Sequence, residues 1–225
     1  MNQWVLPLVV RIERAAPPER TDALEAAAHA VLRLLDQDEW AEPIAQWERI
    51  GIRKVVRRAR GAEWRRALAL PGISVEVRTA EVRTHPPVPL DDWPRDLQRL
   101  QVSGTDLTDS GVPGRPDPES AVLWVNPYLE MSAGKAMAQA GHGAQLAWWG
   151  SDERARDAWR DAGLGVAVRV AAPELWNSLV DSGLPVVRDA GFTEIAPGSV
   201  TVIADAPWLR LGGFRPAGWG PLRAT

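Results

Sequence analysis

The chain has 225 residues, which is enough for one large domain or for two domains of about 100 residues each. Hydrophobic residues make up 45% and charged residues 24%, which argues against wholesale disorder, and the net charge of −3 gives no overall attraction to nucleic acid. The sequence has no cysteine, no apolar run near ~18 residues and no signal-peptide pattern after Met1, so we expect a cytoplasmic protein without disulfides, thiolate metal sites or a membrane span.

The first half predicts alternating strands and helices. A strand is expected over 4–12, where Pro7 favours an edge strand or an early position, and an Ala/Leu-rich helix over 20–36. The next expected elements are a helix over 39–50, a strand over 52–58, a helix over 61–70 and one or two strands over 73–84. Residues 103–118 are rich in Gly, Pro and Asp without periodicity, which predicts a linker.

The second half repeats this order. The expected elements are a strand over 120–126, helices over 132–149 and 152–162, a strand over 165–171, a helix over 173–182, and strands over 184–188 and 199–205. Offsets of 111 to 113 align six residues of the two halves in order, among them Trp47 with Trp159 and Trp64 with Trp176. This indicates an internal duplication. The predicted fold is α/β: two tandem lobes, each with a small mixed β-sheet flanked by helices, packed as an intrachain pseudo-dimer.

One candidate site lies at the start of the helix over 132–149. Gly134 and Lys135 follow a strand and a short turn, and a glycine and a cation at a helix N-terminus favour anion binding. The segment is not a Walker A loop, because Leu129 stands where the first glycine is required and Ala136 follows the lysine. Lys135, Gln139 and His142 share one helix face, which is either a solvated face or the wall of a site.

A second polar segment runs from Asp189 to Thr201. Asp189 ends a strand, Gly191 breaks it, and Thr193 and Thr201 follow on either side of a Pro-Gly turn. Such residues are also common at strand ends for local hydrogen bonding alone, so the segment by itself leaves a structural role and a functional role open.

Together, the segments 131–142 and 189–201 resemble the type II peptidyl-tRNA hydrolase family, and the likeness covers roughly residues 119–208. The resemblance implies cleavage of the ester between peptide and tRNA, which recycles the tRNA, on a small mixed sheet flanked by helices. It places the family's catalytic residues on Lys135, Asp189, Thr193 and Thr201, and its substrate-binding residues on Gly134, Gln139 and His142. The expected domains are a degenerate lobe over 1–102, the linker over 103–118 and a catalytic lobe over 119–225.

The sequence departs from the family pattern in places. Ala133 stands where a second lysine is common, and Asn126 begins a segment that is commonly more polar, so potential phosphate contacts are lost. In the first half, the offsets align Lys135 with Asp22 and Asp189 with Arg78, which assigns no ester chemistry there. A basic run in that half is either a solvated face or a patch for the tRNA backbone, and its central members are Arg53, Lys54, Arg57, Arg58 and Arg60.

Ester hydrolysis needs a group that activates water and donors for the developing oxyanion. We assign Asp189 to orient or activate water, Thr193 and Thr201 to hold the water or the carbonyl, and Lys135 to stabilise the oxyanion or the tRNA terminus. Only two of the 26 basic residues are lysine, and a compact ammonium is expected to be needed at Lys135, whereas Lys54 lies in the arginine-rich run. No cofactor is implied, and three unclustered histidines make a poor metal-ligand set.

Two other functions remain open from the sequence. The chain could be a non-catalytic module that binds tRNA or the ribosome, or a hydrolase of another acyl ester on the same scaffold. The expected partner is peptidyl-tRNA and not a membrane. The sequence leaves further oligomerisation and the role of the tail after Pro207 undetermined.

Overall fold

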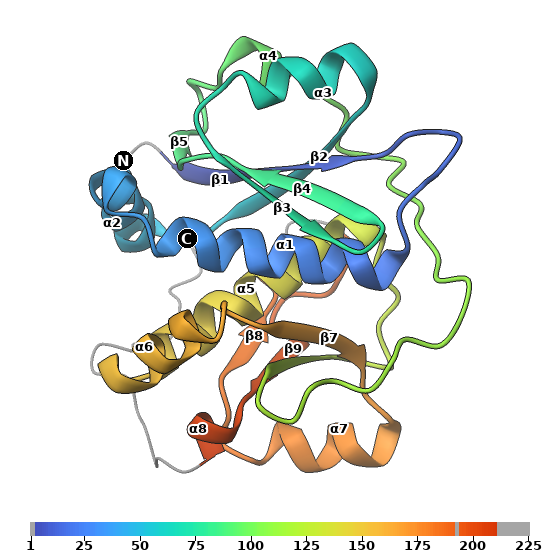
Figure 1. Ribbon diagram of the computed structural model, residues 1–225. Coiled ribbons are helices and arrows are strands. Elements are labelled where there is room, and N and C mark those ends of the chain that lie inside the picture. The colour runs from blue at the N-terminus through green and yellow to red at the C-terminus, as the bar shows by residue number, and fades with distance from the viewer. Residues whose placement is uncertain (1–2, 192–193, 211–225) are drawn as a thin grey trace. The chain divides into compact units, whose positions relative to one another are not determined.

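The computed structural model describes residues 3–191 and 194–210. The chain divides into two compact units, the first formed by Met1–Pro113 with Ser132–His142 and the second by Gly114–Met131 with Gly143–Thr225. Each unit contains one mixed β-sheet (Figure 1). The predicted α/β class with two mixed sheets flanked by helices is therefore confirmed.

The sheet of the first unit has the strand order β2-β1-β4-β3. Its strands are β1 (Trp4–Arg11), β2 (Lys54–Ala59), β3 (Ile73–Val77), β4 (Ala80–Thr84) and β5 (Val88–Pro89), and β5 pairs with the start of β1. Strand β1 runs parallel to β2 and antiparallel to β4, so of the two alternatives that Pro7 suggested the edge strand is wrong, and Pro7 lies in the first half of the strand. Pro7 is tolerated in this central strand because it lies between Val5, which pairs with β5, and Leu8, where the pairing with β4 begins.

Helices cover both faces of this sheet (Figure 1). They are α1 (Arg20–Leu35), the 3-10 turn η1 (Asp38–Trp40), α2 (Ala41–Ile50), α3 (Gly61–Leu68) and α4 (Arg95–Gln98). The long helix α1 packs on β3 and β4, while Trp64 of α3 and Leu97 of α4 form a core cluster with Val9 of β1. Because both faces are covered, β1 is buried from Val5 to Val10 and reads as a continuous apolar run.

The sheet of the second unit has the equivalent order, β7-β6-β9-β8. Its strands are β6 (Ala121–Val125), β7 (Val166–Val170), β8 (Val186–Arg188) and β9 (Val200–Asp205). Strand β6 is parallel to β7 and antiparallel to β9, and β8 pairs with β9 in antiparallel fashion. The remaining helices of the chain are α5 (Ala133–Gly150), α6 (Glu153–Asp161), α7 (Pro173–Val180) and α8 (Pro207–Arg210). Helix α5 is divided between the units, with residues up to His142 in the first unit and those from Gly143 in the second.

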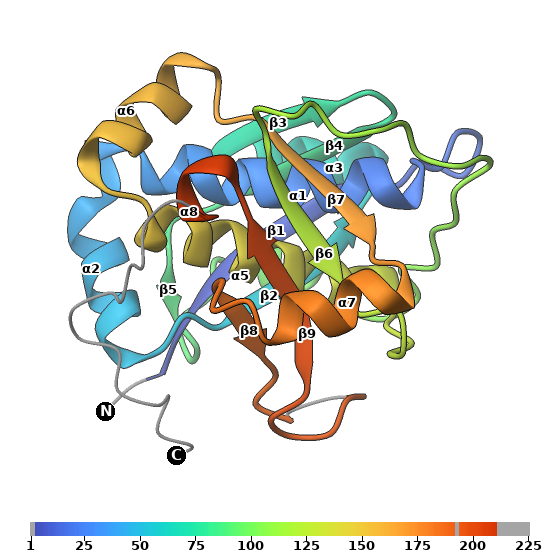
Figure 2. The ribbon, with the colours of Figure 1, turned by 90° about the horizontal axis from the view of Figure 1, so that it is seen from below.

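Two helical segments pack on opposite faces of the second sheet. Trp176 and Leu179 of α7 form a core cluster with Ile203 of β9, and Figure 2 shows α7 lying over this part of the sheet. On the other face, a Cβ added to Gly143 of α5 would lie only 2.8 Å from a methyl carbon of Val202. Glycine at position 143 therefore permits close approach of helix and strand.

The two halves also agree in local detail. The indole Nε1 of Trp47 donates to the carbonyl of Arg53 over 2.9 Å, and that of Trp159 donates to the carbonyl of Gly165 over the same distance. Both pairs are six residues apart and join the end of a helix to the start of the next strand. Trp64 and Trp176 each lie in a core cluster between a helix and the sheet of their own unit.

The predicted elements match the structure in order, with shifts of a few residues at their ends. The sequence patterns missed the short elements β5, α4 and α8, which are too short to produce a periodic signal. Residues 103–118 form neither helix nor strand, as the Gly/Pro-rich composition predicts.

Candidate active site

The start of helix α5 is built by a serine cap. The Ser132 hydroxyl accepts a hydrogen bond from the Lys135 amide over 3.3 Å, and the Ser132 carbonyl accepts from Ala136 over 2.9 Å. Gly134 is half-buried and lies in ordinary van der Waals range of Thr105, since an added Cβ would be 3.6 Å from that side chain. Lys135 is likewise half-buried and lies in the first turn of the helix.

The polar face of α5 is not a solvated face. Gln139 is 4% exposed, and Lys135 and His142 are only partly exposed. Burial lowers the pKa of His142 well below the usual histidine value, and the positive charges of Lys54 and Lys135 lower it further. The imidazole is therefore neutral at physiological pH, with one ring nitrogen as donor and the other as acceptor.

In the second unit, Asp189 lies in a tight turn directly after β8. It is 6% exposed, and its Oδ1 accepts a hydrogen bond from the Gly191 amide over 2.8 Å. The Asp189 amide donates to Ser199 over 2.9 Å, and its carbonyl accepts from Gly198 over 2.7 Å. Gly191 has φ of 78°, and an added Cβ would lie 2.3 Å from a ring carbon of Pro197. Only glycine fits this turn, and the turn fixes the carboxylate.

Thr201 is the residue at which the pairing of β8 with β9 shifts register. Val187 pairs with Val202 and Arg188 with Val200, so Thr201 is left between them as in a β-bulge. Its side chain is fully buried, and its hydroxyl lies 3.4 Å from the Val187 carbonyl. The bulge and the Asp189 turn therefore belong to the same β8–β9 connection. Thr193, also expected at the site, lies outside the described residues.

The sequence reasoning gave no positive role to Asn126, which the structure shows tying the ends of two strands together. Its amide side chain donates to the Val200 carbonyl over 2.7 Å, and its backbone amide donates to the Thr201 carbonyl over 3.0 Å. Its Oδ1 accepts from the Tyr128 amide over 2.8 Å. The signal was an Asn-Pro pair directly after a strand, which favours a side-chain-to-backbone turn.

The central members of the basic run differ in exposure: Lys54 is buried, Arg53, Arg57 and Arg58 are half-buried, and Arg60 is exposed. Lys54 is 7% exposed, so its expected place in a patch for the tRNA backbone is wrong. Arg57 is half-buried, donates to the Leu100 carbonyl over 2.5 Å and stacks 4.4 Å from the centroid of the Trp93 ring. Arg53 donates to the side chain of Gln3 over 2.8 Å.

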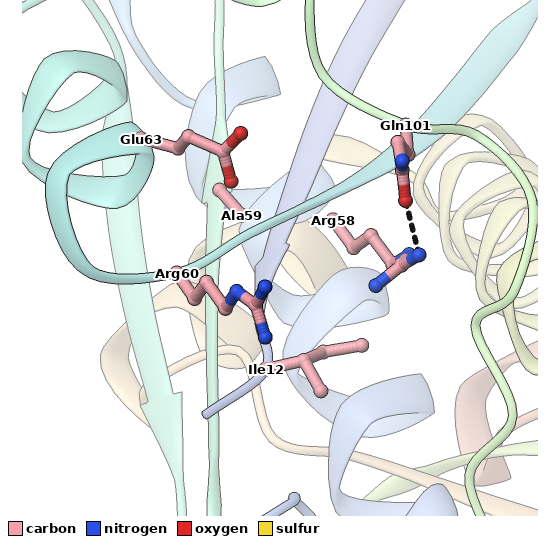
Figure 3. Close-up of a pocket in the computed structure, with 6 residues that line it drawn as sticks. All are labelled: Ile12, Arg58, Ala59, Arg60, Glu63 and Gln101. Carbon is pink, nitrogen blue, oxygen red and sulfur yellow. Dashed lines mark hydrogen bonds between the residues drawn. The ribbon is translucent and has the colours of Figure 1, made fainter. Parts of the chain in front are cut away.

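Arg58 and Arg60 line a shallow polar pocket with Glu63 (Figure 3). The guanidinium of Arg58 donates to the Gln101 side chain and, over 3.0 Å, to the Ser103 carbonyl. Arg60 lies beside this pocket as a second guanidinium. Among the five arginine and lysine residues of the predicted patch, Arg58 and Arg60 are the two that line this pocket.

The two residues that the sequence offsets align with Lys135 and Asp189, Asp22 and Arg78, form an ion pair of inverted charge. Arg78 donates to Asp22 over 2.7 Å and to Glu25 over 2.6 Å, and Asp22 also accepts from the Thr79 hydroxyl over 2.6 Å. Burial acts to raise the pKa of Asp22, but the bonds from Thr79 and Arg78 outweigh it and hold that pKa below the usual value. Two carboxylates closed onto a guanidinium leave no free base for ester chemistry.

The structure thus distributes the predicted site residues over its two units. Gly134, Lys135, Gln139 and His142 belong to the first unit with the basic run, and Asp189 and Thr201 belong to the second. Within the described ranges there is no group of three or more acidic or histidine side chains arranged to hold a metal ion. In the same ranges, every helix is too short or too polar to cross a lipid bilayer.

Chemically, the described residues offer a fixed carboxylate on the β8–β9 connection, and a cation with a neutral imidazole on α5. A carboxylate can accept a proton from water, and a cation can stabilise an oxyanion.

Residues 120–210 match the family model "Peptidyl-tRNA hydrolase PTH2". The chain is 35% identical over 96 residues to a peptidyl-tRNA hydrolase of Methanocaldococcus jannaschii, and the match covers 38% of this chain and 84% of that protein. Both segments that carry the candidate site, 131–142 and 189–201, lie inside the family match. The chain therefore belongs to the peptidyl-tRNA hydrolase PTH2 family.

Proposed function

We propose that the protein hydrolyses the ester bond between a peptide, or an N-blocked amino acid, and tRNA. The observation that carries this proposal is the coincidence of the family match with the constrained turn that holds Asp189. The carboxylate of Asp189 accepts a bond from the Gly191 amide, and the backbone of Asp189 is held by two further bonds. A carboxylate fixed in this way is suited to orient a water molecule, because its position costs no reorganisation during the reaction.

The remaining residues take the roles that their chemistry supports. Lys135, in the first turn of α5, stabilises the oxyanion or the tRNA terminus, where the helix N-terminus adds to its charge. Gly134, Gln139 and His142 contact substrate on the same helix. The buried hydroxyl of Thr201 supports the connection that carries Asp189, and Thr193 completes the set as the family resemblance implies.

A single-turnover assay with an N-acetylated aminoacyl-tRNA tests this assignment. Asp189→Asn removes the base and keeps the shape, whereas Lys135→Arg keeps the charge and changes the shape. We expect both variants to lose at least about a hundred-fold in rate, the usual contribution of an acid–base group for Asp189 and of an oxyanion-stabilising group for Lys135. Arg33→Met, an exposed cation at the end of α1, is the matched control and should cleave at the wild-type rate. Near-normal cleavage by both site variants would refute the assignment.

A hydrolase of another acyl ester is the second candidate function. It is favoured by the internal contacts of Lys54 and Arg57, which reduce the cationic surface available to a tRNA backbone. The same assay with a small aryl ester distinguishes the two: faster cleavage of the aryl ester than of the tRNA ester would favour this second function. Binding of tRNA without cleavage would instead favour a non-catalytic module.

We also infer that the two halves descend from one duplicated domain and that only the second half kept the site. The shared strand order and the matching indole bonds of Trp47 and Trp159 support the duplication. The ion pair of Asp22 with Arg78 supports the loss of chemistry in the first half. It follows that each chain has one site. Asp189→Asn should therefore cleave in a single slow phase, with no fraction of the substrate cleaved at the wild-type rate.

A further inference from the structure

Lys54, which the sequence places in an arginine-rich run, is a buried residue of the first unit. It is 7% exposed, and its Nζ lies 3.2 Å from Nδ1 of His142 and 3.4 Å from the Ile52 carbonyl oxygen. The same atom lies 4.7 Å from the centroid of the Trp47 ring. Two acceptor atoms and an aromatic face thus surround one amine, which is the environment of a hydrogen-bond donor.

Helix α5 leaves room for the stem of this lysine. A Cβ added to Gly141 would lie 3.2 Å from Cδ of Lys54 and 3.1 Å from a methyl carbon of Val31. The lysine methylenes and the valine therefore occupy the space that a side chain at position 141 would need. A planar guanidinium is bulkier than an ammonium and cannot lose its charge, so arginine does not fit this place.

The charges around His142 favour a neutral ring. Burial lowers the pKa of Lys54 well below its usual value, and the carboxylate of Glu48 opposes this effect. Lys54 and Lys135, the only lysines of the chain, both act to lower the pKa of His142 in addition to its burial. A neutral imidazole that accepts at Nδ1 must carry its proton on Nε2.

We propose that Lys54 is a positioning residue of the active site, which donates a hydrogen bond to Nδ1 of His142 and holds that ring in the Nε2–H form. In this form Nε2–H is the donor of the ring, and we assign it to an acceptor oxygen of the substrate; the residue is partly exposed. The consequence for catalysis rests on the proposed function, whereas the contact and the tautomer do not. The first half of the chain thus supplies a residue that orients the His142 side chain on helix α5.

The tautomer of His142 can be measured directly by two-dimensional 1H–15N spectroscopy of the imidazole groups, with the His142 signals assigned from a His142→Gln variant. We expect wild-type protein near neutral pH to show a neutral ring protonated on Nε2. Lys54→Met keeps most of the stem and removes the donor and its charge. In this variant we expect a mixture of tautomers and a raised pKa of His142, because a free Nδ1 without a nearby cation binds a proton more readily. Arg33→Met, which also removes a cation from the first unit, should leave the spectrum unchanged.

The same variants are then compared in cleavage of N-acetylated aminoacyl-tRNA over a range of pH. In Lys54→Met, kcat/KM should fall about ten-fold, as for other residues that orient a functional histidine. Its acid limb should move to higher pH with the pKa of His142, a shift that simple loss of stability does not produce. Because arginine does not fit the place of Lys54, the imidazole spectrum of Lys54→Arg should likewise show a mixture of His142 tautomers in place of the single Nε2–H form.

Two results would overturn the proposal. One is an Nδ1–H ring in the wild-type protein, a measurement that does not depend on Lys54→Met and decides the matter even if that variant does not fold. The other is an unchanged tautomer and pKa of His142 in folded Lys54→Met. If the wild-type protein fails to cleave the tRNA ester, the proposed function is refuted, while the spectra still decide whether Lys54 holds His142.

Discussion

Replacement of Asp22 by asparagine tests whether the inverted ion pair stabilises the first unit. The carboxylate is 6% exposed and accepts bonds from Arg78 over 2.7 Å and from the Thr79 hydroxyl and amide over 2.6 and 3.0 Å. Asparagine keeps one acceptor oxygen but presents an NH₂ group to donors. A bond to a charged group contributes about 1.5–3 kcal/mol, and the Arg78 side chain is 56% exposed, which screens its share. We therefore expect Asp22→Asn to lower the free energy of unfolding by about 2–4 kcal/mol at pH 7.

The pH dependence of this loss has a defined sign. The folded pKa of Asp22 lies below its unfolded value, so the ionised carboxylate stabilises the fold fully above about pH 4 and progressively less as the pH falls through the folded pKa. The difference between wild type and Asp22→Asn should therefore shrink in acid. Urea unfolding at several pH values measures it, with the exposed Asp38→Asn as a control expected to change stability by less than about 0.5 kcal/mol. A loss below about 0.5 kcal/mol at pH 7, or one that is constant with pH, would refute the reasoning.

Three further predictions concern single residues. Gly191→Ala should reduce kcat/KM for the tRNA ester by at least about ten-fold, because φ of 78° and the 2.3 Å approach to Pro197 force the Asp189 turn to move; wild-type kinetics would contradict this. Gly143→Ala should lower the free energy of unfolding, measured in urea, by about 1–3 kcal/mol, because the added Cβ would lie 2.8 Å from Val202. Alanine has the higher helix propensity, so a more stable variant would show that β9 moves to accommodate the methyl group. Burial lowers the pKa of His85 to about 4, so the NMR titration of this histidine should have its midpoint near that pH. The unfolded chain binds the proton at higher pH, so the contribution of His85 to stability should be lost as the pH falls from about 6.5 towards 4. A midpoint near 6.5 would refute the burial of the ring.

The order of elements could be predicted from the sequence because it rests on local patterns. Apolar runs bounded by Gly and Pro mark the buried strands, and helical periodicity marks α1, α5 and α7. The repeat of this order, with Trp47 and Trp159 in register, predicted two similar sheets. The central position of β1 could not be predicted, because the pairing partners of a strand are distant in the sequence and Pro7 left an edge strand and an early position in the strand open.

The candidate residues on α5 and around Asp189 were also found from the sequence, since each segment carries its residues at short, fixed spacings. Lys54 shows the limit of this reasoning. Its position in a run of arginines suggested a solvated cation, although the strand alternation places it on the same face as Val56, which is buried. That alternation was the signal that could have indicated its burial.

The sequence by itself determined the class of fold, the repeated order of elements and the family, because these depend on patterns within segments. Tertiary structure alone decided which polar side chains meet: Lys54 with His142, 88 residues apart, and Arg78 with Asp22, 56 residues apart. The physical reason is that the pairing and burial of a charge depend on the elements that pack around it. The two lysines that looked unlike in the sequence, one in a basic run and one at a helix start, therefore both act on the same histidine.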